Sequence, residues 1–308
     1  MYHFEDLVEM RLDISDVPRG LNLIAGLTGF ADSGSAVTAS MNYLLDTLEH
    51  ETVAVFSADE LLDYRSRRPT IYFDQDHLTG FEPPMLALYL VRDDIDRPFL
   101  LLTGYEPDFK WEAFSRAVVE LTERFAVAST TWVHAIPMPV PHTRPIGTTV
   151  SGNRADLIEQ FSVWRPHTQV PANAMHLIEY RLQEAESEVS GFVLLVPHYL
   201  ADTEYPFATL TALESISSST GLIFPTDRLR EEGREFTTKI DDQVQSNDEL
   251  KKLVKTLEER YDSYMRENGL RSPLMDEEGE LPSADELAAE LEEFLAYRRG
   301  SDDSSDMR

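Results

Sequence analysis

The sequence predicts an α/β protein with a mainly parallel or mixed sheet and helices on both faces of that sheet. Apolar runs such as residues 21–27 (LNLIAGL), 99–103 (FLLLT) and 192–196 (FVLLV) lack polar alternation, which is typical of strands buried on both faces. Segments with helical spacing of apolar residues separate the runs, as in sheets built from strand–helix units. The chain has 308 residues, 42% of them hydrophobic, which is enough for a substantial core.

Strands and helices are expected in alternation through the first 225 residues. Strands are predicted where apolar residues run together between turn formers, at residues 21–27, 52–56, 71–73, 85–91, 99–103, 127–136 and 192–196. Helices are predicted where apolar residues recur every three or four positions, as with Val37, Met41 and Leu44, at residues 37–48, 114–125, 175–185 and 207–216.

The character of the sequence changes near residue 230. The segment Ser246 to Glu249 is a capping box, and Leu250, Val254 and Leu257 begin a heptad-like stripe. A helix stop at Asn268-Gly269 and a second capping box at residues 283–286 complete a helical hairpin. We therefore expect an α/β domain over residues 1–235, a helical hairpin over 236–299 and a disordered tail over 300–308. The apolar stripe must be covered, either by its own domain or by another subunit.

Composition narrows the classes of function. There are no cysteines, so disulfides, thiolate metal sites and cysteine nucleophiles are excluded. The net charge of −29 repels phosphate backbones, which argues against nucleic acid as a partner. No apolar run approaches the ~20 residues of a membrane helix, and the acidic start lacks the pattern of a signal peptide. A cytoplasmic protein with no membrane partner is expected.

Four short polar motifs follow predicted strands. Residues 29–34 (GFADSG), 104–107 (GYEP) and 197–199 (PHY) come directly after strands, and residues 141–145 (PHTRP) follow at a greater distance. In parallel sheets the carboxyl ends of the strands share one edge, where ligands bind. The motifs are therefore predicted to converge, and they supply the candidate pocket or partner-binding residues: Asp32, Ser33, Gly34, Glu106, His142, Arg144, His198 and Tyr199.

Each candidate has a structural and a chemical interpretation. Asp32 is placed to cap the following helix, but it could also bind a hydroxyl or an amine. His142 or His198 could form an acid–base pair with Asp32 or Glu106. Arg144, held between two prolines, is expected to bind a carboxylate, with Asp32 and Glu106 as the leading partners. No three-glycine dinucleotide fingerprint or P-loop lysine is present, and no three ligands converge for a metal, so neither cofactor nor metal is predicted.

The four motifs together, in this order, resemble the proteasome assembly chaperone family in its bacterial, actinobacterial-type branch. The resemblance implies a non-enzymatic, protein-binding or assembly-chaperone-like module, a three-layer fold similar to nucleoside phosphorylases, and homo-oligomers. With the heptad-like stripe it favours a trimer. Family members that dock on proteasome rings end in a hydrophobic–Tyr–any tripeptide, whereas the present sequence ends Asp306-Met307-Arg308. Docking in that mode is not expected, and the client is left open.

A second hypothesis is an enzyme. A hydrolase or phosphorylase acting on a small polar substrate would use the cleft at the strand ends. The imidazoles and carboxylates would move protons, and Arg144 would hold an anionic group of the substrate. No catalytic residue is assigned, because nothing in the spacing requires this chemistry.

Overall fold

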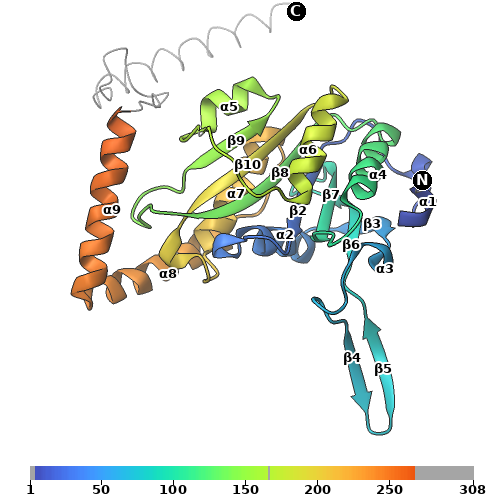
Figure 1. The fold of residues 1–308 in the computed structure, drawn as a ribbon, viewed down its shortest axis with the longest axis horizontal. Coiled ribbons are helices and arrows are strands. Elements are labelled where there is room, and N and C mark those ends of the chain that lie inside the picture. Colours follow the sequence, from blue (N-terminus) through green and yellow to red (C-terminus); the bar gives the residue numbers. More distant parts are fainter. Residues whose placement is uncertain (1–3, 166, 268–308) are drawn as a thin grey trace, which may run out of the picture. The chain divides into compact units, whose positions relative to one another are not determined.

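The computed structural model describes residues 4–165 and 167–267. The chain divides into two compact units, Met1–Glu259 and Arg260–Arg308, and the fold described below is that of the first. Its centre is an eight-stranded sheet, shown in Figure 1. The strands are β1 (Val8–Met10), β2 (Leu23–Thr28), β3 (His50–Phe56), β6 (Leu86–Arg92), β7 (Pro98–Tyr105), β8 (Thr130–Met138), β9 (Thr148–Gly152) and β10 (Val189–Pro197).

The sheet is mixed, and its parallel part is central. The strand order is β1-β3-β6-β7-β2-β8-β10-β9. Strands β7, β2, β8 and β10 run parallel to one another, while β1, β3, β6 and β9 make antiparallel pairs toward the two edges. The prediction of a mainly parallel or mixed sheet is confirmed. All four parallel strands end at the same edge, which positions the candidate site.

Helices cover both faces, as predicted. One buried cluster joins the sheet to α1 (Phe4–Leu7), α3 (Ala58–Leu61), α4 (Trp111–Arg124) and α6 (Ala174–Glu184). The other cluster joins the opposite face to α2 (Ala36–Thr47), α5 (Ala155–Phe161), α7 (Pro206–Thr220) and α8 (Asp227–Gln245). Neighbouring strand residues alternate between the clusters: Leu23 and Ala25 belong to the first and Ile24 to the second. This alternation explains the continuous apolar runs in the sequence, since both faces of each central strand are buried.

One central contact depends on a glycine. Gly191 of β10 lies beside Trp132 of β8 in the parallel ladder. A Cβ atom at position 191 would lie 2.4 Å from the indole of Trp132. The indole is fully buried, so a larger residue there would require the packing of the sheet to shift.

The predicted strand at residues 71–73 forms, but it does not join the main sheet. It lies in β4 (Thr70–Asp74), which among the described residues pairs with β5 (His77–Glu82) alone, as a two-stranded hairpin. Figure 1 shows the hairpin extending away from the sheet, and every residue of both strands is exposed. An apolar run is therefore not a sufficient sign of a buried strand in this chain.

The C-terminal segment of the described chain is helical. The expected boundary between residues 235 and 236 lies inside α8, whose Phe236 and Ile240 pack on the second core cluster. The next helix is α9 (Asp248–Glu267), in which Val254 and Leu257 are buried. The second helix of the expected hairpin and the tail at 300–308 fall outside the described residues, so the division into domains stays a prediction. No helix of the described chain is long and apolar enough to cross a membrane.

Candidate functional site

The four motifs meet at the carboxyl edge of the parallel strands. Hydrogen bonds join the motifs directly or through the adjoining residue or two: the Glu106 N–H donates to the Thr28 carbonyl (2.7 Å), and the Gly34 N–H donates to the Ala201 carbonyl (2.8 Å). The His142 N–H donates to the Tyr199 hydroxyl oxygen (2.7 Å). The short 3₁₀ helices η2 (Ser33–Ser35) and η3 (His198–Leu200) lie in contact beside β8. The predicted convergence is confirmed, and the side chains at this edge define the candidate site.

Asp32 acts as a helix cap. Its Oδ1 accepts from the Val37 N–H (2.8 Å), and its Oδ2 accepts from the N–H (2.9 Å) and the hydroxyl (2.6 Å) of Thr38. Both carboxylate oxygens therefore satisfy the otherwise unpaired first turn of α2. The capping interpretation is confirmed, and the turn leaves neither of these N–H groups for an anion.

Ser33 and Gly34 are part of the packing at this edge. Both are buried, and Gly34 has a φ of +70°. A Cβ at position 34 would lie 3.2 Å from the Cβ of Tyr205 and 3.3 Å from that of Ala208. The turn thus needs glycine for its left-handed conformation and for the close approach of α7.

Glu106 is buried against the start of α6. Its Oε1 accepts from the Ala174 N–H at 2.5 Å. Burial raises the pKa of Glu106, while the Ala174 N–H and the nearby Arg67 guanidinium oppose that rise. The expectation that Glu106 pairs with Arg144 is wrong: the cation beside it is Arg67, which itself pairs with Asp108.

His142 lies at the centre of a hydrogen-bonded chain. Its side chain is 1% exposed. Its backbone N–H donates to the Tyr199 hydroxyl oxygen (2.7 Å), and that hydroxyl also lies 2.7 Å from His142 Nδ1. On the other side of the ring, Nε2 lies 3.1 Å from Asp241 Oδ1. The His142–Tyr199–Asp241 chain ties the proline-bracketed loop to η3 and α8.

The positions of the protons follow from these contacts. The Tyr199 oxygen already accepts the backbone N–H, so its own proton can be donated to Nδ1 of His142. Burial raises the pKa of Tyr199 to about 12, with Glu258 and Asp241 adding to that effect, so the phenol keeps its proton at neutral pH. With Nδ1 accepting from the phenol, Nε2 is the ring nitrogen that donates to Asp241. The predicted acid–base pairing of His142 with Asp32 or Glu106 is wrong, because Tyr199 and Asp241 hold the ring.

Arg144 does bind a carboxylate, but not one of those expected. Its Nη1 lies 3.5 Å from Glu258 Oε1, and the Thr143 hydroxyl donates to the same carboxylate at 2.5 Å. Both partners of the ion pair are about one-third exposed. Sequence reasoning missed Glu258 and Asp241 because they lie more than 95 residues beyond their partners in the chain.

His198 is exposed at the same edge. Its ring lies edge-on to Tyr199, with centroids 5.4 Å apart. Among the described residues it has no carboxylate partner, so the proposed pairing of His198 with Asp32 or Glu106 does not form. Its role as a binding residue stays a prediction.

A further histidine at this edge was missed by sequence reasoning. His134 on β8 is 5% exposed, and its ring nitrogens have no hydrogen-bond partner in the described chain. The ring of Phe30 lies parallel to it at 5.9 Å, and His176 lies edge-on at 6.3 Å. Burial lowers the pKa of His134 to about 4, helped by His176 and opposed by Asp32. The available signal was strand alternation, which places His134 on the same face as Trp132.

The His176 and Glu179 pair on α6 does not form a metal site. The Glu179 carboxylate accepts from Trp132 Nε1 and from the Ser151 hydroxyl, both at 2.7 Å. Nδ1 of His176 accepts from the Asn173 N–H in a capping box at the start of the helix. In the part of the chain that the structure describes, no three His, Asp or Glu side chains are arranged to hold a metal ion.

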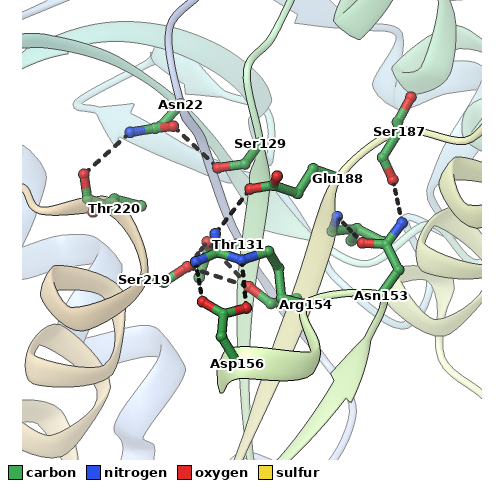
Figure 2. A network of polar contacts seen from close by, with 12 residues as sticks. Asn22, Ser129, Thr131, Asn153, Arg154, Asp156, Ser187, Glu188, Ser219 and Thr220 are labelled. Carbon is green, nitrogen blue, oxygen red and sulfur yellow. Dashed lines mark hydrogen bonds and ion pairs between the residues drawn. The ribbon is translucent and has the colours of Figure 1, made fainter. Parts of the chain in front are cut away.

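The opposite edge of the sheet carries a structural network, shown in Figure 2. Arg154 pairs with Asp156 (2.6 Å) and Glu188 (2.8 Å), and these two carboxylates raise its pKa further. The Asn22 amide accepts from the Ser129 hydroxyl at 3.0 Å. These residues lie at the edge where the parallel strands begin, and their polar groups satisfy one another.

The comparisons with known proteins identify the family. The model of the PAC2 family matches residues 26–244. The chain belongs to the PAC2 family. This confirms the family resemblance predicted from the four motifs. No curated protein matches the chain significantly.

Solved structures of similar proteins support the assignment. A Corynebacterium glutamicum protein of unknown function is 38% identical, with a TM-score of 0.80 over 85% of this chain and 98% of its own. A Mycobacterium tuberculosis protein of unknown function is 42% identical, with a TM-score of 0.78 over 84% of this chain and 92% of its own. A proteasome-assembly chaperone homologue from M. tuberculosis shares the fold at 20% identity, with a TM-score of 0.70 over 76% of this chain and 100% of its own.

Proposed function

We propose that this PAC2 family protein is a non-enzymatic, assembly-chaperone-like module that binds other polypeptides, including copies of itself, in the cytoplasm. Family membership supports the general role. The proteasome-assembly chaperone homologue of M. tuberculosis has the same fold, and so does an archaeal proteasome activator from Pyrococcus furiosus, with a TM-score of 0.57. The client of the present chain stays open.

The pairing of the candidate residues supports binding over catalysis. Asp32 caps α2, Glu106 accepts from the start of α6, and His142 is held on both sides. A catalytic acid or base needs a free hydrogen-bonding atom directed at a substrate. These three side chains are instead held by backbone N–H groups and by other side chains, so we interpret them as groups that shape the edge rather than as a reactive centre.

The β4–β5 hairpin carries the proposal. Its large apolar side chains are exposed by 46% at Ile71, 57% at Tyr72, 72% at Phe73, 60% at Leu78 and 58% at Phe81. Isolated two-stranded hairpins are marginally stable in water, and contiguous exposed apolar surface marks interaction sites. A second polypeptide that covers this hairpin would bury the exposed apolar side chains and stabilise the two strands. In a homo-oligomer that polypeptide would be a second copy of the chain.

The oligomer can be tested by light scattering. Light scattering of the wild-type protein should give a mass well above that of the 35.1 kDa monomer, and we expect the mass of a trimer. A triple variant of the hairpin, Tyr72→Ser, Phe73→Ser and Phe81→Ser, is expected to shift to the monomer, because these side chains would no longer favour burial. The matched control replaces three exposed apolar residues elsewhere: Ile95→Ser, Phe109→Ser and Val170→Ser.

Binding to other polypeptides needs a separate readout. A photo-crosslinking amino acid at position 73 should give adducts in cells, whereas one at the exposed Glu123 should not. Adducts containing only this chain would support the oligomer and oppose a client at the hairpin. A wild-type monomer at all concentrations, together with no adduct from position 73, would refute the proposed binding surface.

A further inference from the structure

A groove of about 860 Å³ lies beside β1, the outermost strand of the main sheet. Residues 5–9, from α1 into β1, contribute consecutive positions to its lining. The rest of the lining includes residues 55–59, at the end of β3 and the start of α3, and residues 81–85, where the β4–β5 hairpin returns to the sheet. All of these segments belong to the first compact unit.

The outer edge of β1 is open, since in the described chain β1 pairs with β3 alone. The Leu7 carbonyl accepts a hydrogen bond from the residue after β3 at 2.9 Å, and the Arg11 N–H donates one to β3 at 2.8 Å. Because backbone groups alternate in direction along an antiparallel ladder, the Val8 carbonyl and the Met10 N–H point away from β3. This acceptor and donor flank Glu9, and an added strand would use both.

The facing part of the lining is poorly suited to pair with this edge itself. Pro83 and Pro84 belong to the lining, and proline has no N–H to donate to a strand. On either side of them, Phe81 is 58% exposed and Met85 is 53% exposed. Exposed apolar side chains beside an open sheet edge are typical of a surface that another polypeptide covers.

The groove is also acidic. Its lining has one guanidinium, that of Arg11, against five exposed carboxylates, on Glu5, Asp6, Glu9, Asp59 and Glu82. Arg11 already lies 3.0 Å from Glu9, in an exposed pair that solvent screens. The charge of the lining therefore complements a basic partner.

The same charge argues against a segment of this protein as the occupant. Residues 268–308, which lie outside the described residues, include 12 acidic and 4 basic side chains. The turn of the β4–β5 hairpin, residues 74–76, has the sequence Asp-Gln-Asp, so the hairpin tip of a second copy would bring carboxylates toward carboxylates. Like charges brought together at an interface oppose binding.

We propose that this groove binds an extended basic segment of a client polypeptide, which adds a strand beside β1. The proposal rests on the polypeptide-binding role proposed above and specifies the chemistry of the partner. Main-chain hydrogen bonds to the Val8 carbonyl and the Met10 N–H would hold the segment. The residue between these bonds would lie beside Glu9, where a lysine or arginine forms a favourable cross-strand pair. Apolar residues at the alternate positions would extend the face on which Val8 and Met10 join the first core cluster.

Fluorescence polarisation with a short labelled peptide of alternating lysine and valine tests the proposal on the full-length protein. This peptide should bind saturably, and one with glutamate in place of lysine should not. A peptide of the same composition, with the lysines and valines in separate blocks, should bind at least about tenfold more weakly, because it cannot match the two faces of a strand.

Two pairs of protein variants separate strand addition from general attraction to an acidic protein. Met10→Pro removes the outward N–H, at an edge position where proline is tolerated, whereas its matched control Met10→Ala keeps that N–H. The proline variant should bind the alternating peptide about tenfold more weakly than the alanine variant. Glu9→Gln/Glu82→Gln should also weaken binding. Asp16→Asn/Glu123→Gln, with the same change in net charge at exposed positions outside the groove, should not.

Several results would overturn the proposal. These are no saturable binding of the alternating peptide, equal binding of the alternating and blocked peptides, or equal binding by the proline and alanine variants. Light scattering adds a further test: a loss of oligomer mass in Met10→Pro but not in Met10→Ala would assign the edge to a second copy instead of a client. Failure here is distinguishable from failure of the proposed function, because the oligomer and crosslinking tests of the hairpin use neither this peptide nor these variants.

Discussion

Replacing Tyr199 by phenylalanine tests the polar chain at the carboxyl edge. The Tyr199 hydroxyl makes two contacts of 2.7 Å with His142, one to the backbone N–H and one to Nδ1. Because the His142 side chain is only 1% exposed, water cannot readily replace the lost group. The change removes the hydroxyl and leaves the ring packing intact.

The expected cost follows from these contacts. A typical hydrogen bond contributes about 0.5–1.5 kcal/mol net, and a buried group left without a partner costs about 1–3 kcal/mol. Tyr199→Phe should therefore lower the free energy of unfolding by about 2–3 kcal/mol. Asp241→Asn should cost at most about 1 kcal/mol, because the Asp241 side chain is 53% exposed and an amide oxygen can still accept from Nε2.

Urea unfolding at one fixed protein concentration measures both values, since the stability of an oligomer depends on concentration. Tyr180→Phe is the matched control: Tyr180 is 57% exposed, so loss of its hydroxyl should change little. A Tyr199→Phe cost below about 0.5 kcal/mol, or a larger cost for Asp241→Asn than for Tyr199→Phe, would refute the argument that the buried contacts hold the loop.

Three other predictions concern charge and boundaries. The pKa of His134 falls from 6.5 to about 4 on folding, so between these pH values the unfolded chain binds more protons than the folded chain. The free energy of unfolding should therefore fall as the pH drops from 7.5 to 5, and this residue should account for about 2 kcal/mol of that loss. His134→Gln should remove that part of the pH dependence, and an unchanged pH profile would contradict it. Arg144→Ala should cost at most about 1 kcal/mol, since both partners of its pair with Glu258 are about one-third exposed; a loss of 3 kcal/mol or more in urea unfolding would indicate a buried pair instead. A chain ending at residue 259, the limit of the first compact unit, should unfold cooperatively by calorimetry. A chain ending at residue 235 should still fold, but it should melt at a lower temperature because it loses Phe236 and Ile240 from the core. If the shorter chain is insoluble or unfolds without cooperativity, the domain boundary lies in α8 or beyond.

The sequence alone determined the class of fold and the edge at which the motifs meet. Continuous apolar runs indicated strands that are buried on both faces, as in β2 and β7. Such strands have apolar residues on both faces, so polar and apolar residues do not alternate along them. The motifs at strand ends predicted their own convergence, since parallel strands share a carboxyl edge. The role of Asp32 as a cap was also local, as a cap and its helix are adjacent in the chain.

The partners of the polar groups were decided only by the tertiary structure. His142 meets Asp241 across 99 positions, and Arg144 meets Glu258 across 114. Spacing along the chain carries no information about such pairs. The exposed β4–β5 hairpin shows the same limit. Residues 71–73 are as apolar as a core strand, yet within the described chain β4 pairs with β5 alone. Local sequence specifies an extended conformation, but burial depends on which surfaces the rest of the fold brings alongside.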